Sequence, residues 1–199
     1  MAKVFRLVPP RSSELLTQCQ QMASQRLPDA LKVVLDKVDD TFFDLANKAD
    51  NSQRQNLFFD AMRELRLKRD LIEAGFLSSF NAEFEDCIEH KNATKHSRVF
   101  TPTTELSLVD ADDLEESLAL TNFVDSVRVK CKEQLFGLDK RMGYLLNQPD
   151  LLNEQNPVGP HVIGRAFRDA MRPLESNIEV KLTLFKILDK YAAHSIYQM

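Results

Sequence analysis

A dense group of carboxylates at residues 110–116 is the first place in the sequence where side chains could bind a ligand. Its members are Asp110, Asp112, Asp113, Glu115 and Glu116. Carboxylates at this density can hold a divalent cation, although the glycine and distal glutamate of an EF-hand loop are missing. Acidic side chains also suit the first turn of a helix, where they accept hydrogen bonds from free backbone N–H groups. The pattern favours a helix start, so we expect no metal-dependent folding.

Cysteine and histidine residues give little support for catalysis. Cys87 and His90 are three residues apart on one helical face, where a thiolate and an imidazole could form a nucleophile or ligate zinc. Further ligands are missing, so a core cysteine beside a helix-end histidine is the better interpretation. No histidine follows a glutamate by three residues, which excludes the Glu-x-x-His pairs of a di-iron bundle. We predict no catalytic residue, no cofactor and no metal site, and we expect no enzymatic activity.

A basic run lies at residues 63–69. Its basic residues are Arg63, Arg66, Lys68 and Arg69, and a polar loop adds Lys91, Lys95 and Arg98. Such a cluster could contact the phosphates of a nucleic acid. However, acidic residues alternate with the basic run, which is typical of a solvated, salt-paired helix face. The net charge of −4 also argues against a dedicated nucleic-acid binder.

The composition predicts that helices position these residues. Only 5 glycines and 8 prolines occur in 199 residues, which argues against a turn-rich β protein. With 43% hydrophobic residues, the chain can bury a substantial core. We predict an all-α fold, a bundle of six or seven helices built around long helices at 52–89 and 110–146. An irregular segment, 1–11, would precede a single helical domain, 12–199.

Capping and breaking residues divide this domain into elements. Ser12 and Ser13 can cap a helix to about residue 26, and Pro28 suits the start of a second helix to about residue 48. That second helix carries a heptad-like seam of apolar residues: Leu31, Leu35, Val38, Phe42 and Leu45. A third helix spans 51–90, where Gly75 could bend or divide it. Residues 105–110 alternate briefly and could be extended. The Asn156–Pro160 turn, with two prolines and one glycine, should rigidly position a helix at 160–171.

The segment from Ile178 to Met199 predicts a helix with apolar residues on two opposite sides. One side carries Ile178, Leu182, Phe185 and Ala192, and the other carries Val180, Leu184, Ile187 and Tyr191. A surface helix needs only one apolar stripe, and this helix is followed by no Gly, Asn or Pro stop signal. We therefore expect the second set to bind a partner, with a homodimer as the simplest arrangement. The same features predict the N-terminal part of a longer protein.

Cysteine usage and hydropathy indicate a cytoplasmic protein. Cys19, Cys87 and Cys131 are odd in number and widely spaced, which fits a reducing compartment better than a disulfide scaffold. The first ten residues lack the apolar core of a signal peptide. No apolar run approaches the roughly 20 residues needed to span a bilayer, so no membrane association is expected.

Two stretches carry a family resemblance. One is Leu108–Leu120 (LVDADDLEESLAL); the other is Asn156–Phe167 (NPVGPHVIGRAF), which Lys181–Lys190 (KLTLFKILDK) follows. They resemble the bacterial proteins of domain-of-unknown-function family 1631, clearly over the second half of the chain and by general character over the first. Members are much longer than 199 residues, and some are labelled thymidine phosphorylase. The chain lacks a glycine-rich phosphate loop, and the resemblance implies no catalytic residues.

Taken together, these observations favour a helical protein–protein interaction or regulatory module without catalytic activity of its own. The alternatives are a nucleic-acid- or nucleotide-binding regulator that uses the basic run, and the non-catalytic part of an enzyme whose active site lies elsewhere. A continuous basic surface would favour nucleic acid, and interleaved charges would favour a protein partner.

Overall fold

The computed structural model describes residues 10–89 and 111–197, and all regular structure in these two stretches is helical, which confirms the all-α fold class. The described helices are α1 (Pro10–Asn47), α2 (Ser52–Ile88), α4 (Ala111–Lys130), α5 (Lys132–Leu145), α6 (Pro160–Ala170), α7 (Ile178–Tyr197) and a short 3-10 helix, η1 (Asn153–Gln155). The predicted extended segment 105–110 lies outside the described residues.

α1 is one helix of 38 residues and not the two helices that the sequence predicts. It begins at Pro10, two residues before the predicted start, and it continues through Pro28. A proline inside a helix removes one backbone hydrogen bond and costs about 3 kcal/mol. Leu27, Leu31 and Val34 are buried on both sides of Pro28, so continuous packing outweighs this local cost.

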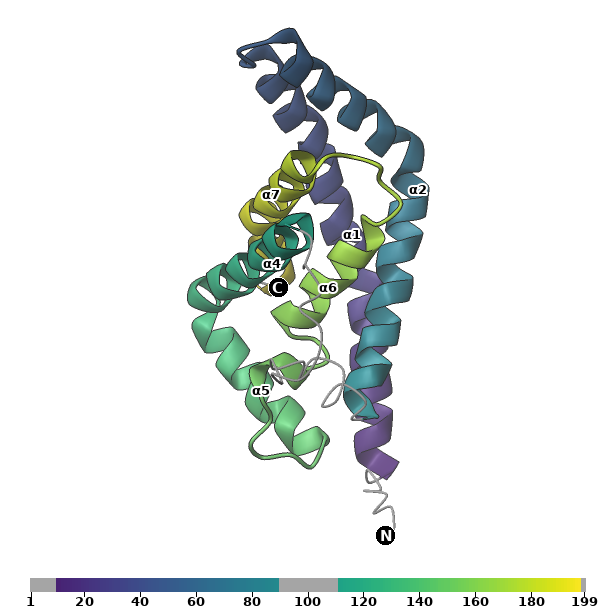
Figure 1. Ribbon diagram of the computed structural model, residues 1–199. Helices are drawn as coiled ribbons and strands as arrows, with labels where there is room; N and C mark the ends of the chain where they lie inside the picture. Colours follow the sequence, from purple (N-terminus) through teal and green to yellow (C-terminus); the bar gives the residue numbers. More distant parts are fainter. Residues whose placement is uncertain (1–9, 90–110, 198–199) are drawn as a thin grey trace, which may run out of the picture.

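α2 runs antiparallel to α1 after a short turn (Figure 1). Asn51 caps its start, because the Asn51 Oδ1 accepts a hydrogen bond of 2.8 Å from the backbone N–H of Arg54. Gly75 does not divide α2. A Cβ atom at Gly75 would lie 3.8 Å from the Ala170 Cα, so the glycine lies where α6 packs closely against α2.

The predicted long helix 110–146 is two helices, α4 and α5, because the chain departs from helical geometry at Cys131 (φ −118°, ψ 33°). Neither Gly137 nor Gly143 marks the break. The change of direction allows Met142 and Leu146 of the second segment to pack against Leu16 of α1. A straight helix would carry these two apolar side chains away from that contact.

The main core lies where α6 and α7 fill the space between the α1–α2 pair and α4 (Figure 1). α6 contacts both α2 and α4, whereas α7 contacts both α1 and α4. The largest fully buried side chains include Phe42, Phe80, Phe84 and Phe167. A buried ion pair adds a polar link between α6 and α2, since the Arg165 Nε lies 2.8 Å from the Glu83 Oε2. α4 and α5 follow one another along the side of the molecule opposite α1 and α2 (Figure 1).

Candidate partner-binding groove

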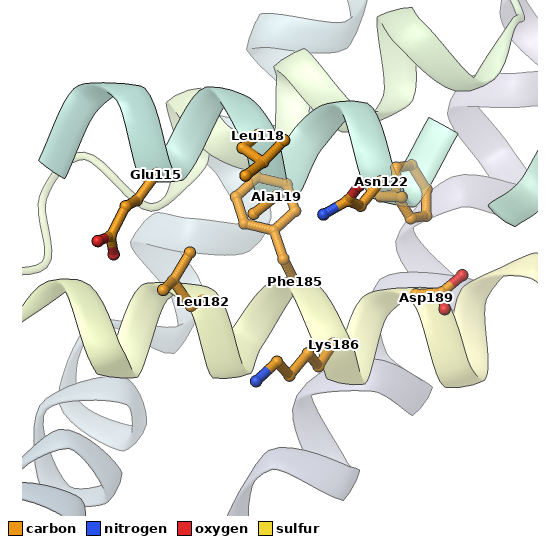
Figure 2. Close-up of a pocket in the computed structure, with 9 residues that line it drawn as sticks. Glu115, Leu118, Ala119, Asn122, Leu182, Phe185, Lys186 and Asp189 are labelled. Atoms are coloured by element: carbon orange, nitrogen blue, oxygen red, sulfur yellow. The ribbon is translucent and has the colours of Figure 1, made fainter. Parts of the chain in front are cut away.

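A groove of about 410 Å³ runs between α4 and α7. Its lining residues are Glu115, Leu118, Ala119, Asn122, Phe123, Leu182, Phe185, Lys186 and Asp189, and we call it the α4–α7 groove. Figure 2 shows the Phe185 ring extending from α7 toward Leu118 and Ala119 of α4. The wall is therefore apolar in the middle and polar along the edges, the arrangement that a protein-binding site needs for affinity and orientation.

The groove is held open by contacts within the chain. The Phe185 ring packs edge-on against Phe167 of α6, with ring centroids 5.5 Å apart and an interplanar angle of 73°. At one end the Lys130 Nζ lies 2.9 Å from the Asp189 Oδ1, and near the other the Lys181 Nζ lies 3.8 Å from the Glu116 Oε2. Both pairs join α4 to α7. The groove exists before any partner binds, which lowers the conformational cost of binding.

Leu118 is the most accessible apolar side chain of the α4–α7 groove, with 59% of its surface exposed. Leu114, one helical turn earlier on α4, is also exposed. These two leucines extend the apolar wall of the groove onto the outer surface of α4. Adjacent exposed leucines beside a preformed groove have the character of a partner site.

The beginning of α4 makes one end of the groove acidic. Asp112 and Asp113 lie in the first turn of α4, which confirms the predicted helix start, and Glu115 follows on the groove edge. Figure 2 shows Glu115 extending from α4 toward α7, whereas Lys186 extends from α7 away from α4. No ion pair joins Asp113 or Glu115 to another described residue. These carboxylates favour a partner that carries basic residues.

The predicted partner face of the terminal helix needs correction. Val180, Leu184 and Ile187 are buried in the core of the same chain, so they do not form a surface. Tyr191 is partly buried, with the Lys190 Nζ 5.1 Å from its ring centroid. The physical reason is that α1 packs directly on α7. The opposite side of this helix, which the sequence also shows as apolar, supplies Leu182 and Phe185 to the groove.

Three members of the basic run are held in ion pairs. Arg66 bonds Asp39 at 2.8 Å, Lys68 bonds Glu64 at 2.7 Å, and Arg69 bonds Asp36 at 2.8 Å and Glu73 at 3.0 Å. The hydrogen bonds that Arg69 donates to the carboxylates of Asp36 and Glu73 raise the pKa of Arg69. Arg63 is exposed, and Lys91, Lys95 and Arg98 lie outside the described residues. The charges are thus interleaved along α2 and join it to α1.

The thiols are poorly suited to act as nucleophiles. Cys87 and Cys131 are buried, and Cys19 is partly buried. Burial raises the pKa of the Cys19 and Cys131 thiols, so both are protonated at neutral pH. His90, the predicted neighbour of Cys87, lies outside the described residues. Across residues 10–89 and 111–191, no three His, Cys, Asp or Glu side chains are grouped so as to hold a metal ion.

A polar network fixes the turn before α6, where the sequence predicts a rigid connection. The fully buried Asn156 donates from Nδ2 to the Asp139 Oδ1 at 2.7 Å, and its Oδ1 accepts from the Val158 N–H at 3.1 Å. Asp139 also pairs with Arg128 at 3.3 Å. The network therefore connects the turn to both α4 and α5. Asp139, the side-chain partner of Asn156, lies 17 residues earlier in the chain, so the prolines and glycine of the turn alone could not reveal it.

Comparisons with known proteins concern this same set of helices. No helix in the described stretches has the length and apolar content needed to cross a membrane. No curated protein and no solved structure matched the chain. A family model described as "Protein of unknown function (DUF1631) N-terminal domain" matches residues 11–199. The chain therefore belongs to the DUF1631 family, as its N-terminal domain, which confirms the resemblance found in the sequence motifs.

Proposed function

We propose that this chain is a helical protein–protein interaction and regulatory module without catalytic activity of its own, and that the α4–α7 groove binds a helix of the partner. The observation that carries this proposal is the exposure of Leu118 beside a preformed apolar groove. A partner helix can place an apolar side chain against Leu118 and Phe185. Its basic side chains can then approach Glu115 and Asp113.

The surface charges support a protein partner over a nucleic acid. Basic residues of α2 already bond acidic residues on α1 or α2, and phosphate contacts would have to compete with those pairs. The exposed carboxylates of Asp113 and Glu115 at the start of α4 would repel a phosphate backbone. We also propose that the chain forms a homodimer in the cytoplasm, where its protonated thiols would remain reduced.

Site-specific photo-crosslinking tests this function. A photoreactive amino acid at Leu118 in the native host should yield crosslinks to a protein, identified by mass spectrometry. Leu67 on α2 provides a matched control, because it is a leucine with 77% of its surface exposed that lies outside the groove. A crosslinking pattern from position 118 that is absent, or that is identical to the pattern from position 67, would overturn the proposal.

A further inference from the structure

α5 exposes aromatic rings that its own chain does not cover. Phe136 and Tyr144 have 65% and 83% of their surfaces exposed, and Lys140 lies between them at helical spacing. The Lys140 Nζ lies 5.8 Å from the Phe136 ring centroid, so the charge and the ring share one side of α5. We call Phe136, Lys140 and Tyr144 the aromatic stripe.

The packing of α5 against its own chain does not require the aromatic stripe. Leu135 and Met142 are the buried apolar side chains of α5: Leu135 packs in the main core, and Met142 packs with Leu16 and Leu146. Exposed aromatic rings contribute little to folding, whereas tyrosine and phenylalanine are enriched at the centres of protein interfaces. The stripe is therefore available for a contact between molecules.

The aromatic stripe and the α4–α7 groove have complementary chemistry. The groove offers apolar side chains, Leu118 and Phe185, next to the carboxylates of Asp113 and Glu115, and Lys186 is the one cation among the described residues that line it. The stripe offers two rings and Lys140. The exposed Lys132 and Arg141 lie on the same helix and outnumber its exposed acid, Glu133. One helix thus carries both features that the groove favours in a partner, apolar rings and positive charge.

We infer that the helix bound in the α4–α7 groove is α5 of a second copy of this chain. This inference rests on the proposed function and names its partner. α4, which forms one wall of the groove, and α5 follow one another along the same side of the molecule (Figure 1), so one side of each copy carries both the groove wall and the aromatic stripe's helix. A two-fold axis can pair two such sides so that each α5 lies against the other copy's groove. Both contacts form at once in this arrangement, and the assembly closes as a dimer.

Analytical ultracentrifugation of the chain tests the dimer. The wild-type chain should sediment as a dimer, whereas Leu118→Asp and Tyr144→Asp should each raise the dissociation constant at least about tenfold, because each places a charge in the apolar contact. Leu67→Asp should dimerise like the wild type. All of these positions are exposed, so circular dichroism should show the same helix content in every variant.

Crosslink mapping on the purified chain identifies the surface that occupies the groove. A photoreactive group at position 118 should attach to a peptide from α5 of the other copy. A monomeric wild type, a dimer that persists in both charged variants, or a crosslink that maps outside α5 would overturn the inference. If the wild type is monomeric while position 118 captures a different protein in cells, the proposed function stands and the second copy is rejected.

Discussion

Two regions of the molecule place similar aromatic side chains in opposite environments. The body, which consists of α1, α2 and α6, buries most of its phenylalanines, namely Phe42, Phe58, Phe76, Phe80, Phe84 and Phe167, although Phe43 of α1 is exposed. The arm, which consists of α4 and α5, buries Phe123 but leaves Phe136 and Tyr144 in solvent. Rings of the first kind stabilise the fold through burial. We propose that rings of the second kind contribute mainly to contacts with another molecule, so the two regions should respond differently to the same substitution.

Replacing one buried and one exposed phenylalanine should give the largest contrast. Phe80→Ala removes a fully buried ring and should lower the free energy of unfolding by about 3–5 kcal/mol. Phe136→Ala should change it by less than about 0.5 kcal/mol while weakening self-association. Urea denaturation and sedimentation measure the two effects. Equal losses of stability in both variants would show that the arm is also stabilised by its exposed ring.

The ion pairs of the body should differ in the same way according to burial. Glu83→Gln leaves the buried Arg165 guanidinium without its charged partner, so it should lower the free energy of unfolding by roughly 3 kcal/mol. This value is at the lower end for a buried ion pair because Glu83 is partly exposed. Asp39→Asn, which disrupts the exposed pair with Arg66, should cost less than about 1 kcal/mol. Thermal denaturation at neutral pH compares them. A smaller loss for Glu83→Gln than for Asp39→Asn would contradict the assignment of Arg165 to the core.

Two glycines of α5 test how tightly the arm itself is packed. A Cβ at Gly143 would lie 2.7 Å from the Gln148 carbonyl oxygen, so Gly143→Ala should destabilise the chain by about 1–3 kcal/mol. Gly137 has nothing within 4 Å of a Cβ position, and Gly137→Ala should stabilise the chain by about 0.5–1 kcal/mol through higher helix propensity. Denaturation midpoints of the two variants should therefore move in opposite directions; a shared direction would refute this packing.

A pH-dependent effect concerns Glu64, which joins the body to the segment before α7. Burial alone would raise the Glu64 pKa, but hydrogen bonds from Lys68, Ser176 and the Glu175 N–H, with the Lys68 charge, hold it below its ordinary value of 4.5. A carboxylate with a lowered folded-state pKa contributes stability above its unfolded pKa, and this contribution disappears as the pH falls through the folded value.

Glu64→Gln should therefore cost about 1 kcal/mol at pH 7 and progressively less as the pH falls below 4.5. Denaturation of wild type and variant across this pH range measures the difference between their unfolding free energies. Glu175→Gln is a suitable control, because the Glu175 side chain is exposed. A difference that is constant with pH would mean that Glu64 acts through packing and not through its charge.

The sequence predicts the helical class and most helix positions because these follow from local periodicity and capping. The start of α2 at Asn51 and the acidic first turn of α4 are examples of such local signals. Predictions at Pro28 and Cys131 are wrong because tertiary packing decides them. α1 stays helical through Pro28 because it packs along α2 on both sides of the proline. The chain changes direction at Cys131, a residue type with no strong tendency to break helices, because α5 packs against Leu16.

The candidate site could be predicted only in part for a related reason. The periodicity of α7 correctly indicates two apolar sides, but it cannot say which of them the rest of the chain covers. α1 covers Val180, Leu184 and Ile187, which leaves Leu182 and Phe185 for the groove. The exposure of Leu118 and Tyr144 likewise depends on distant segments. Buried and exposed apolar residues have the same spacing along a helix, and only the fold separates them.

Pro28 affects how the two parts of α1 unfold locally. Proline has no backbone N–H to donate to the Ser24 carbonyl, so one hydrogen bond of α1 is missing there. Protection of the backbone amides against hydrogen exchange should therefore change at this point of α1. The segment before Pro28 carries Leu16, which packs against Met142 and Leu146, and the segment after it carries Phe42 in the main core. α1 is one helix, but its amide hydrogens can therefore exchange in two units that open separately. Opening of the unit before Pro28 would release the end of α5.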